Sequence, residues 1–337
     1  MASLPTETWH EWVTRSAPPA AWLADDGPHR EIVLSTRLRV ARNLPPYPFP
    51  CAAAPTDLEE VTRRLLNAQP LSGWQHLSRL SEVERDLYLS SRLLSPDLDT
   101  FLPHRWLLVD PTRSQSAMIH EEDHLRLQVL SPGWNPTGAL DQLQGTHSQL
   151  ENQLQFAHTP RLGFLTSSPS NLGSGQRASA LVHLVALAHG KQLKSVFEAL
   201  IDRGVVVRGL FGESSRGVGA FFQISQTQSF NSSFCGAIEF LLQRESESRA
   251  AIDTTERNRL VEEAVVFAVR QREIKFSDAL RVLAWVRLAA AMGDFGPAVS
   301  ARRIDEWIGA LDVRSGESAP HLDRRRAERL RPLLEKL

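Results

Sequence analysis

The sequence is poor in cysteine, tyrosine and lysine, and it contains no long apolar run. Its 337 residues include only two cysteines, Cys51 and Cys235, which excludes a disulfide framework and a thiolate metal site. No segment approaches the roughly 18 consecutive apolar residues of a transmembrane helix. The N-terminal segment lacks a basic start followed by an apolar core, so we expect no signal peptide. Together these absences favour a cytoplasmic protein.

Neither sign of charge is in excess, and the positive charge is almost entirely arginine. The formal net charge is −1, so no global field attracts nucleic acid or an anionic membrane. Of the 38 lysine and arginine residues, four are lysine and the other 34 are arginine. Arginine is a planar, permanently charged fork that suits phosphates and carboxylates, but a GC-rich genome alone accounts for most of such an excess. Position along the chain must therefore identify the arginines that bind an anion.

Length and composition are those of an ordinary globular protein with one large domain and an appendage, or with two domains. Apolar residues make up 42% of the chain and charged residues 23%. Residues 1–28 show no clear period and predict an irregular arm. After residue 255 only helical patterns occur, which predicts a domain boundary there. The expected domains are therefore 1–28, 29–254 and 255–337.

The segment from Met118 to Val129 concentrates charged residues in an alternating pattern. From Glu122 onward, one parity holds Glu122, His124, Arg126 and Gln128, and the other holds Asp123, Leu125, Leu127 and Val129. A period of two predicts a strand, which would put Glu122 and Arg126 on one face about 13 Å apart. A solvated charge run on an edge strand is the simpler alternative.

Two further predicted strands carry arginine. The run from Glu31 to Pro50 predicts a half-buried strand that projects Arg37 and Arg39 from its non-core face and is ended by prolines. The run from Gly204 onward predicts another strand, with Arg208 in its middle and Glu213 at its end. Two arginines in phase on one strand suggest an anion site.

A segment rich in turn-forming residues, from Ser167 to Gly175, follows a short predicted strand, and we call it the glycine loop. The pattern after it predicts a helix that has Arg177 in its first turn. A glycine loop that opens a helix can present backbone N–H groups to an anion. This loop has neither the Walker signature nor a complete dinucleotide fingerprint, so by itself it is weak evidence.

Helical periodicity accounts for most of the remaining chain. Helices are predicted within residues 56–100 and 138–158, and strands within 105–110, 116–119 and 218–225. Beyond residue 255, one helix starts after Asp253, a second spans about 277–293, a third contains Trp307, and the basic tail forms a fourth.

Five arginines and two acids stand out because they lie on predicted strands or beside a turn. Five cations without paired acids are costly unless they meet a polyanion. A nucleoside triphosphate with Mg²⁺ is the natural candidate, and the two acids suit a cationic co-substrate. The residues are Arg37, Arg39, Arg126, Arg177, Arg208, Glu122 and Glu213.

In four segments the sequence resembles the ATP:guanido phosphotransferases, the family of the arginine and creatine kinases. The segments are STRLRVARNL from Ser35, EEDHLR from Glu121, LGFLTSSPSNLGSGQRAS from Leu162 and VVRGLFGE from Val206. The resemblance implies an α+β fold of the guanido kinase and glutamine synthetase type, in which helices flank an antiparallel sheet, with a helical C-terminal domain. It also implies in-line transfer of the γ-phosphoryl group of ATP to a guanidino nitrogen.

The resemblance implies a role for each of these residues. Glu122 matches the acid that orients and deprotonates the guanidinium, and Glu213 the second substrate-holding acid, beside a loop that closes over the site. Mg²⁺ is held mainly by ATP, with no metal ligand from the protein. The arginines that match the family's ATP-phosphate ligands are Arg37, Arg39, Arg126, Arg177 and Arg208.

Two positions in these motifs differ from the family, and near Arg92 a family histidine associated with adenine binding is replaced. Ser168, which with Asn171 lies in the substrate loop, replaces a reactive cysteine, so we expect slower turnover or an altered pH dependence. His120 replaces an asparagine before the acidic pair.

Within the family the chain looks closest to the bacterial protein-arginine kinases. About thirty residues precede the first motif, so the helical domain that selects small substrates in phosphagen kinases is expected to be missing. The helices after residue 255 imply a homodimer and a phosphoarginine-binding motif. That motif matches at Asp323, Arg326 and Ala327 but has Leu322 in place of its first arginine. An ordinary solvated helix is the alternative for this tail.

The expected function is that of a cytoplasmic protein-arginine kinase that uses ATP and Mg²⁺ and acts on exposed arginines of proteins. The resemblance implies a role in stress control, an activator protein and Clp-type protease machinery as partners, and neither nucleic acid nor membrane binding. One alternative is a kinase of free arginine or another small guanidino compound. The other is a non-catalytic regulator that binds phosphoarginine.

Overall fold

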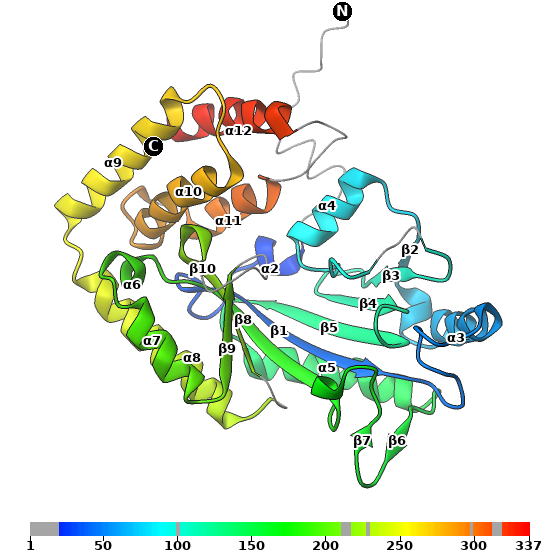
Figure 1. The fold of residues 1–337 in the computed structure, drawn as a ribbon. Coiled ribbons are helices and arrows are strands. Elements are labelled where there is room, and N and C mark those ends of the chain that lie inside the picture. Colours follow the sequence, from blue (N-terminus) through cyan, green and yellow to red (C-terminus); the bar gives the residue numbers. More distant parts are fainter. Residues whose placement is uncertain (1–19, 99–101, 210–216, 227–229, 297–298, 312–318) are drawn as a thin grey trace, which may run out of the picture.

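A single eight-stranded antiparallel sheet forms the centre of the molecule in the computed structural model (Figure 1). The structure describes residues 20–98, 102–209, 217–226, 230–296, 299–311 and 319–337. The strand order is β2-β3-β4-β5-β1-β8-β10-β9, and a separate two-stranded hairpin, β6-β7, projects from the body. The strands are β1 (Val33–Arg42), β2 (Gln75–Leu77), β3 (Trp106–Val109), β4 (Gln115–Ile119), β5 (Leu125–Pro132), β6 (His158–Thr159), β7 (Gly163–Phe164), β8 (Gln176–His183), β9 (Val205–Gly209) and β10 (Phe221–Gln226).

Helices flank this sheet, which confirms the predicted α+β class. In Figure 1, α5 runs behind β1 and β5, and the last four helices gather at one end of the sheet. None of the described helices is long and apolar enough to cross a bilayer. The helices are α2 (Ala21–Ala24), α3 (Pro55–Asn67), α4 (Glu82–Ser90), α5 (Pro136–Glu151), α6 (Val185–His189), α7 (Leu193–Ile201), α8 (Ser232–Ala250), α9 (Thr254–Arg270), α10 (Phe276–Ala291), α11 (Ala301–Ala310) and α12 (Ala319–Leu334), with short 3₁₀ turns η1 (Leu71–Gly73), η2 (Pro169–Asn171) and η3 (Val218–Ala220).

The central strand, β1, has the two faces that its sequence predicts. Leu38 and Val40 are buried on the side of α5, whereas Arg37 and Arg39 are only half-buried on the opposite side. Because the side chains of a strand alternate, an apolar face toward α5 forces the arginines onto the other face of the sheet. The predicted arginine-bearing strand is thus confirmed.

The predicted helix after the glycine loop is wrong: residues 176–183 form strand β8, in the middle of the sheet between β1 and β10. Ala178, Ala180 and Val182 are buried on one face, and Ser179 and Leu181 on the other. A strand that is covered on both faces has a nearly continuous run of small and apolar residues in its sequence. Periodicity cannot distinguish such a run from a buried helix. Consequently no helix N-terminus follows the glycine loop.

The charged segment from Met118 to Val129 is a hairpin and not one strand. β4 ends at Ile119, a turn covers residues 120–124, and β5 begins at Leu125. Glu122 therefore lies in the turn, and the Nη2 atom of Arg126 is 3.8 Å from its Oε2 atom. The predicted separation of these two groups along a strand is wrong because the chain reverses between them.

The region from 56 to 100, predicted to be helical, contains two separate helices. α3 ends at Asn67, shortly before Pro70, and edge strand β2 lies between it and α4. Proline cannot continue a helix because it lacks the N–H donor and its ring clashes with the preceding turn. The helix predicted for 138–158 is confirmed as α5, although it ends at Glu151.

The C-terminal helices are joined to the sheet by buried charges. Arg287 of α10 and Asp305 of α11 have no exposed side-chain surface, and their Nε and Oδ1 atoms are 2.6 Å apart. Arg287 also donates to the backbone oxygens of Arg30 and Glu31, just before β1, at 2.8 Å each. Arg30 in turn pairs with Asp305 at 3.3 Å. The helices beyond residue 255 therefore fix the start of the central strand.

A second buried pair extends this network to α8. The Nε atom of Arg249 lies 2.8 Å from Oε1 of Glu245, and its guanidinium donates to the backbone oxygens of Glu31 and His183. The Glu245 carboxylate accepts the first backbone N–H groups of α6, from Ala186 and Leu187. The carboxylate thereby satisfies N–H donors at a helix start that have no partner within the helix.

Removal of Asp305 should destabilise the whole fold. In Asp305→Ala, Arg287 and Arg30 remain buried without their counter-charge, and we expect the free energy of unfolding to fall by about 3–5 kcal/mol. Urea denaturation followed by circular dichroism measures this change. Glu263→Ala, which breaks the exposed pair with Arg259, is the control and should have almost no effect. An effect of Asp305→Ala as small as the control's would mean that the network contributes little.

Candidate active site

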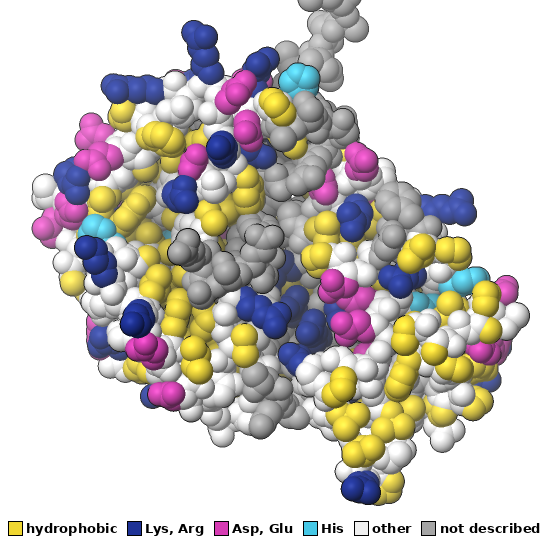
Figure 2. All heavy atoms as spheres, in the orientation of Figure 1, with side chains coloured by type: hydrophobic (Ala, Val, Ile, Leu, Met, Phe, Trp, Pro, Cys, Tyr) yellow, Lys and Arg dark blue, Asp and Glu magenta, His cyan; other side chains and the backbone are white. Residues whose placement is uncertain are grey.

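A cavity of about 970 Å³ opens on the face of the sheet that carries Arg37 and Arg39. Figure 2 shows basic side chains gathered in a hollow near the middle of the molecule, with acidic side chains beside them. The volume is within the range of small-molecule sites. The cavity brings together eight residues predicted from the sequence, namely Arg37, Arg39, Glu122, Arg126, Ser168, Asn171, Arg177 and Arg208. Glu213 lies outside the residues that the structure describes.

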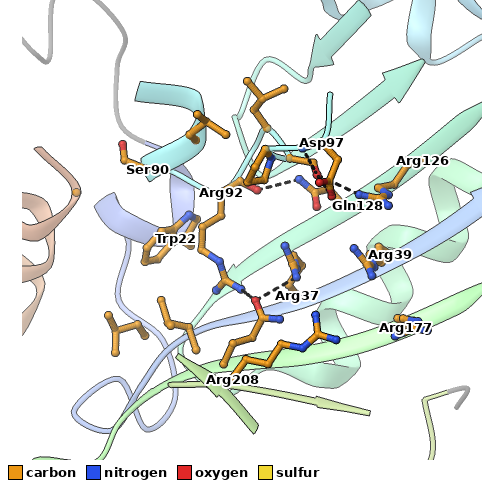
Figure 3. A pocket seen from close by; sticks show the side chains of 18 of the residues that line it. Trp22, Arg37, Arg39, Ser90, Arg92, Asp97, Arg126, Gln128, Arg177 and Arg208 are labelled. Atoms are coloured by element: carbon orange, nitrogen blue, oxygen red, sulfur yellow. Dashed lines mark hydrogen bonds between the residues drawn. The ribbon is translucent and has the colours of Figure 1, made fainter. Parts of the chain in front are cut away.

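Strand register spreads the arginines over successive rows of the sheet. Arg126 of β5 pairs with Ala41 of β1, whereas Arg39 pairs with Arg177 of β8. Arg37, two residues further along β1, forms the next row, about 7 Å away at the usual rise per residue. The cations are therefore spread around the cavity from several neighbouring strands (Figure 3), an arrangement that suits an anion with several charged groups.

The arginines repel one another because their guanidinium groups lie close together and away from much of the solvent. Burial lowers the pKa of Arg37 well below its usual range, and the neighbouring Arg92 and Arg126 lower it further. The pKa of Arg39 is depressed in the same way, by burial first and then by Arg37 and Arg126. Within the described chain, Arg39 forms no hydrogen bond or ion pair, and neither does Arg208. A multiply charged anion would relieve this repulsion and engage the available donors.

Two adjacent acids at the hairpin turn occupy different environments. The Glu121 side chain is 1% exposed, and its Oε1 atom accepts a hydrogen bond from Nη1 of Arg126 at 2.5 Å. Burial raises the pKa of Glu121, an effect that Arg126 partly offsets. The Glu122 side chain is 48% exposed at the edge of the cavity. Glu121 therefore anchors Arg126, and Glu122 is the carboxylate that a ligand can reach.

Asp123, the third acid of the turn, ties three sequence motifs together. Its Oδ1 atom accepts hydrogen bonds from Nδ2 of Asn43 and from the backbone N–H of Ser167, both at 2.7 Å. The Asn43 Oδ1 atom in turn accepts from the backbone N–H of His124. The end of β1, the acidic turn and the glycine loop are thus held in one arrangement.

The glycine loop is fastened to its neighbours by two arginines. The Arg177 Nε donates to Oδ1 of Asn171 at 2.8 Å, and Arg42 donates to the backbone oxygen of Ser174 at 2.9 Å. Gly175 has a φ of +63°, and a Cβ atom there would lie 2.7 Å from the backbone oxygen of Ala41. Only glycine fits this close approach. The loop therefore orients Arg177 and does not present a helix N-terminus to an anion, which corrects the sequence-based expectation.

Arg92, near which a family histidine associated with adenine binding is replaced, is part of the cavity. Its guanidinium donates to Oγ of Ser35 at 3.0 Å and to Oε1 of Gln223 at 2.7 Å (Figure 3). Gln223 also accepts from Arg37 at 3.2 Å. Burial lowers the pKa of Arg92 to about 10. Arg92 follows α4 in an irregular segment and meets Ser35 and Gln223 only across the sheet, so no local pattern predicts these contacts.

The predicted regulatory residues lie within the C-terminal helices. The Arg326 guanidinium is buried and donates to Asp323 at 2.5 Å and to the backbone oxygens of Ile274 and Leu311. Ala327 and Leu322 are also buried. Arg326 therefore binds α12 to the segments before α10 and after α11, in an arrangement unlike that of an ordinary solvated helix.

The comparisons with known proteins agree on one family. A family model described as ATP:guanido phosphotransferase, C-terminal catalytic domain, matches residues 58–244. The protein-arginine kinase of Symbiobacterium thermophilum is 33% identical over 325 residues, which cover 90% of each chain. The protein-arginine kinase of Halothermothrix orenii is 35% identical over 291 residues, covering 81% of this chain and 82% of the relative.

Two solved structures share the fold. A taurocyamine kinase from Schistosoma mansoni with bound transition-state analogue components superposes with a TM-score of 0.58 at 21% identity, covering 68% of this chain and 36% of that one. A lombricine kinase superposes with a TM-score of 0.57 at 18% identity, covering 72% and 77%. At these identities the likeness concerns the fold alone.

His120, which precedes the acidic pair, is a buried neutral histidine. Its Nε2 atom lies 3.0 Å from Oγ1 of Thr62 and 3.1 Å from the backbone oxygen of Leu58. Burial, more than any neighbour, lowers its pKa to about 4. Between pH 6.5 and 4 the unfolded chain therefore takes up a proton that the folded protein does not. Stability is complete above this window and falls as the pH is lowered through it.

Replacement of His120 by asparagine should reduce this acid sensitivity. The residue has a φ of +60°, which asparagine tolerates, so the substitution should not strain the turn. We expect the loss of unfolding free energy between pH 7 and pH 5 to be about 2 kcal/mol smaller in His120→Asn than in the wild type. Urea denaturation at both pH values measures it, with His158→Asn, at an exposed site, as the control. An unchanged loss would mean that other groups cause the acid sensitivity.

Proposed function

The chain belongs to the ATP:guanido phosphotransferase family, and from this premise we propose that it is a protein-arginine kinase. It transfers the γ-phosphoryl group of ATP to guanidino groups of arginine residues in proteins. One observation carries the proposal: five arginines and the accessible carboxylate of Glu122 meet in one cavity. The relatives named protein-arginine kinase match nearly the whole chain, and this supports a protein as the substrate.

In this proposal the arginine rows hold the triphosphate. Phosphoryl transfer requires little covalent chemistry from the protein and depends on positioning and charge neutralisation. Permanently charged donors at fixed positions stabilise the charge that develops on the transferred group. Support comes from the buried, mutually repelling guanidinium groups, whose depressed pKa values are relieved by a polyanion. The proposed phosphate ligands are Arg37, Arg39, Arg126, Arg177 and Arg208.

Glu122 is the proposed base. A protonated guanidinium is a poor nucleophile, and its pKa exceeds 12, so a carboxylate must hold it and accept its proton. The exposed position of Glu122 at the cavity edge, 3.8 Å from a proposed phosphate ligand, supports this role. Glu213 is the proposed second acid for the guanidinium, and Ser168 and Asn171 are proposed to shape the substrate side of the site.

Mg²⁺ is the proposed cofactor, bound mainly through the nucleotide. Among the described residues no group of three or more His, Cys, Asp or Glu side chains could hold a metal ion. Mg²⁺ usually keeps waters and binds substrate phosphates with one or two carboxylates, and Glu121 has a buried Oε2 atom without a partner beside the arginines. When bound with the nucleotide, the ion would neutralise part of the phosphate charge.

We also propose the wider setting that the family likeness suggests. The kinase acts in the cytoplasm, where ATP is available, as a homodimer formed through its C-terminal helices. Domain limits of 1–28, 29–254 and 255–337, an activator protein, Clp-type protease partners and a role in stress control belong to this proposal. Phosphoarginine binding by Asp323, Arg326 and Ala327 also belongs to it. For such binding, the ion pair between Asp323 and Arg326 would have to open.

One assay distinguishes this function from its alternatives. The full-length protein is incubated with Mg-ATP and either an arginine-rich protein or free arginine, and phosphoarginine is detected by mass spectrometry under neutral conditions. We expect phosphoarginine on the protein. A product on free arginine alone would identify a small-guanidino kinase. Intact ATP binding without any product would identify a non-catalytic binding protein.

Substitution of Glu122 by glutamine should remove the base while keeping the shape of the site. We expect the turnover rate to fall by roughly 10²–10⁴, or about 3–5 kcal/mol of barrier, with little change in ATP affinity. The rate is measured as phosphoarginine formed on an arginine-rich protein. Glu262→Gln, at an exposed position of α9, is the matched control. A rate near that of the wild type would exclude Glu122 from the chemistry.

A further inference from the structure

Two large apolar side chains are exposed where the glycine loop meets the β6-β7 hairpin. Leu162, just before β7, is 45% exposed, and Leu172, just after η2, is 42% exposed. Pro160 and Pro169, in the same two segments, are also exposed. In Figure 2, hydrophobic side chains gather over the projecting hairpin, beside the hollow that holds the arginines. We call the surface of these two leucines and two prolines the hairpin patch.

The two leucines are neighbours because their segments touch through two glycines. Gly163 forms a β-bridge with Gly173, and the backbone N–H of Phe164 donates to the Gly173 oxygen at 2.7 Å. A Cβ atom on Gly163 would lie 2.7 Å from the Cα atom of Gly173, so only glycine permits this approach. Leu162 and Leu172 each precede one of these glycines, about 3.8 Å along the backbone. They therefore form one surface, unlike surface leucines that are scattered singly.

The glycine loop holds its part of the patch in a fixed position beside the reacting groups. At the start of the loop, Oδ1 of Asp123 in the acidic turn accepts the backbone N–H of Ser167 at 2.7 Å. Further along, Nε of Arg177 donates to Oδ1 of Asn171 at 2.8 Å, and Leu172 is the next residue. The segment that carries Leu172 is thus fastened both to the acidic turn and to a proposed phosphate ligand.

The hairpin part of the patch is supported by Arg42, at the end of β1. The guanidinium carbon of Arg42 lies 3.5 Å from the centre of the Phe164 ring, a favourable cation–π contact. The same guanidinium donates to the backbone oxygens of Ser174 at 2.9 Å and Ala41 at 2.7 Å. Strand β7 is therefore held against the central sheet, and the patch does not lie on a free hairpin.

The position of the patch indicates what covers it. Ser168 and Asn171 line the cavity, so the patch continues the substrate side of the proposed site. Five residues lead from Ser167, which binds the acidic turn, to Leu172, and they span at most about 17 Å. An extended polypeptide advances about 3.3 Å per residue. A protein whose target arginine reaches Glu122 therefore has a residue over the patch within about five positions of that arginine.

We propose that the hairpin patch is a docking surface for protein substrates and that it selects arginines with an apolar residue within about five positions. Contact between that residue and the two leucines removes apolar surface from water, which favours association. The proposal rests on the proposed function, because it takes a polypeptide as the phosphoryl acceptor. It adds a preference for the neighbours of the target arginine, to which the arginine-lined cavity itself is indifferent.

A second copy of this chain is the alternative occupant of an exposed apolar surface. Loss of the patch would then change the mass of the particle in solution and leave the choice among substrates as it was. Light scattering coupled to size-exclusion chromatography of the wild type and of Leu162→Ser measures that mass. A changed mass together with an unchanged choice of substrate would overturn the docking surface.

Two peptides with a single arginine each test the docking surface. One has leucine at the second and fourth positions on either side of the arginine, and the other has serine there. The full-length protein phosphorylates them with Mg-ATP, and phosphoarginine is detected by mass spectrometry under neutral conditions. We expect kcat/KM to be about tenfold higher for the leucine peptide, chiefly through a lower KM.

Substitutions in the patch should remove this advantage. In Leu162→Ser and in Leu172→Ser we expect it to fall to about twofold or less, whereas Leu162→Met, which keeps an apolar side chain, should retain it. Ile201→Ser is the matched control, because it removes an equally large apolar side chain, 61% exposed, from the end of α7. The control should keep the advantage of the wild type.

Equal kcat/KM for the two peptides in the wild type, or an advantage that both serine variants retain, would overturn the docking surface. The wild-type comparison decides even if a variant does not fold. Fluorescence anisotropy of the labelled peptides measures their binding without turnover. Tighter binding of the leucine peptide that Leu162→Ser abolishes, without any phosphoarginine, would refute the proposed function and leave the docking surface standing. Phosphoarginine on both peptides without a preference would do the reverse.

Discussion

Repulsion among arginines that lie close together and half-buried on one face of the sheet is the constraint on which the arrangement of this protein depends. Burial and mutual proximity depress the pKa values of Arg37, Arg39 and Arg92 together. Among the residues that the structure describes, only Glu121, through Arg126, supplies a buried counter-charge within the cluster. Such a cluster persists because the stability of the surrounding fold outweighs the repulsion. A polyanion that neutralises the cluster therefore binds with a favourable electrostatic free energy.

The scaffold holds the cluster from both ends of β1. At one end, Asn43 and Asp123 bind the acidic turn to the glycine loop. At the other end, Arg287 and Asp305 bind the C-terminal helices to the residues that precede β1. The register of the central strands then fixes the spacing between rows of cations. Positioning of this kind is what phosphoryl transfer requires from a protein, since the chemistry itself needs little covalent participation.

Much of the site was predictable where the relevant signal is local. Alternation along residues 31–42 predicted that Arg37 and Arg39 share a face, and β1 has that geometry because its other face must pack against α5. The motifs also indicated the family and hence the sheet. Local signals failed where burial hides periodicity, as in β8, and where the chain turns within a charged run, as between Ile119 and Leu125.

The sequence by itself determined which side chains are available and on which face of each local strand they project, because a period of two follows from the backbone alone. Only the tertiary structure decided which of them meet. Glu121 and not Glu122 binds Arg126 most closely, because the chain reverses direction in the hairpin turn between these acids and Arg126. Arg92 reaches Ser35 and Gln223 across 57 and 131 residues. Pairings over such separations depend on sheet order and register, which no local pattern encodes.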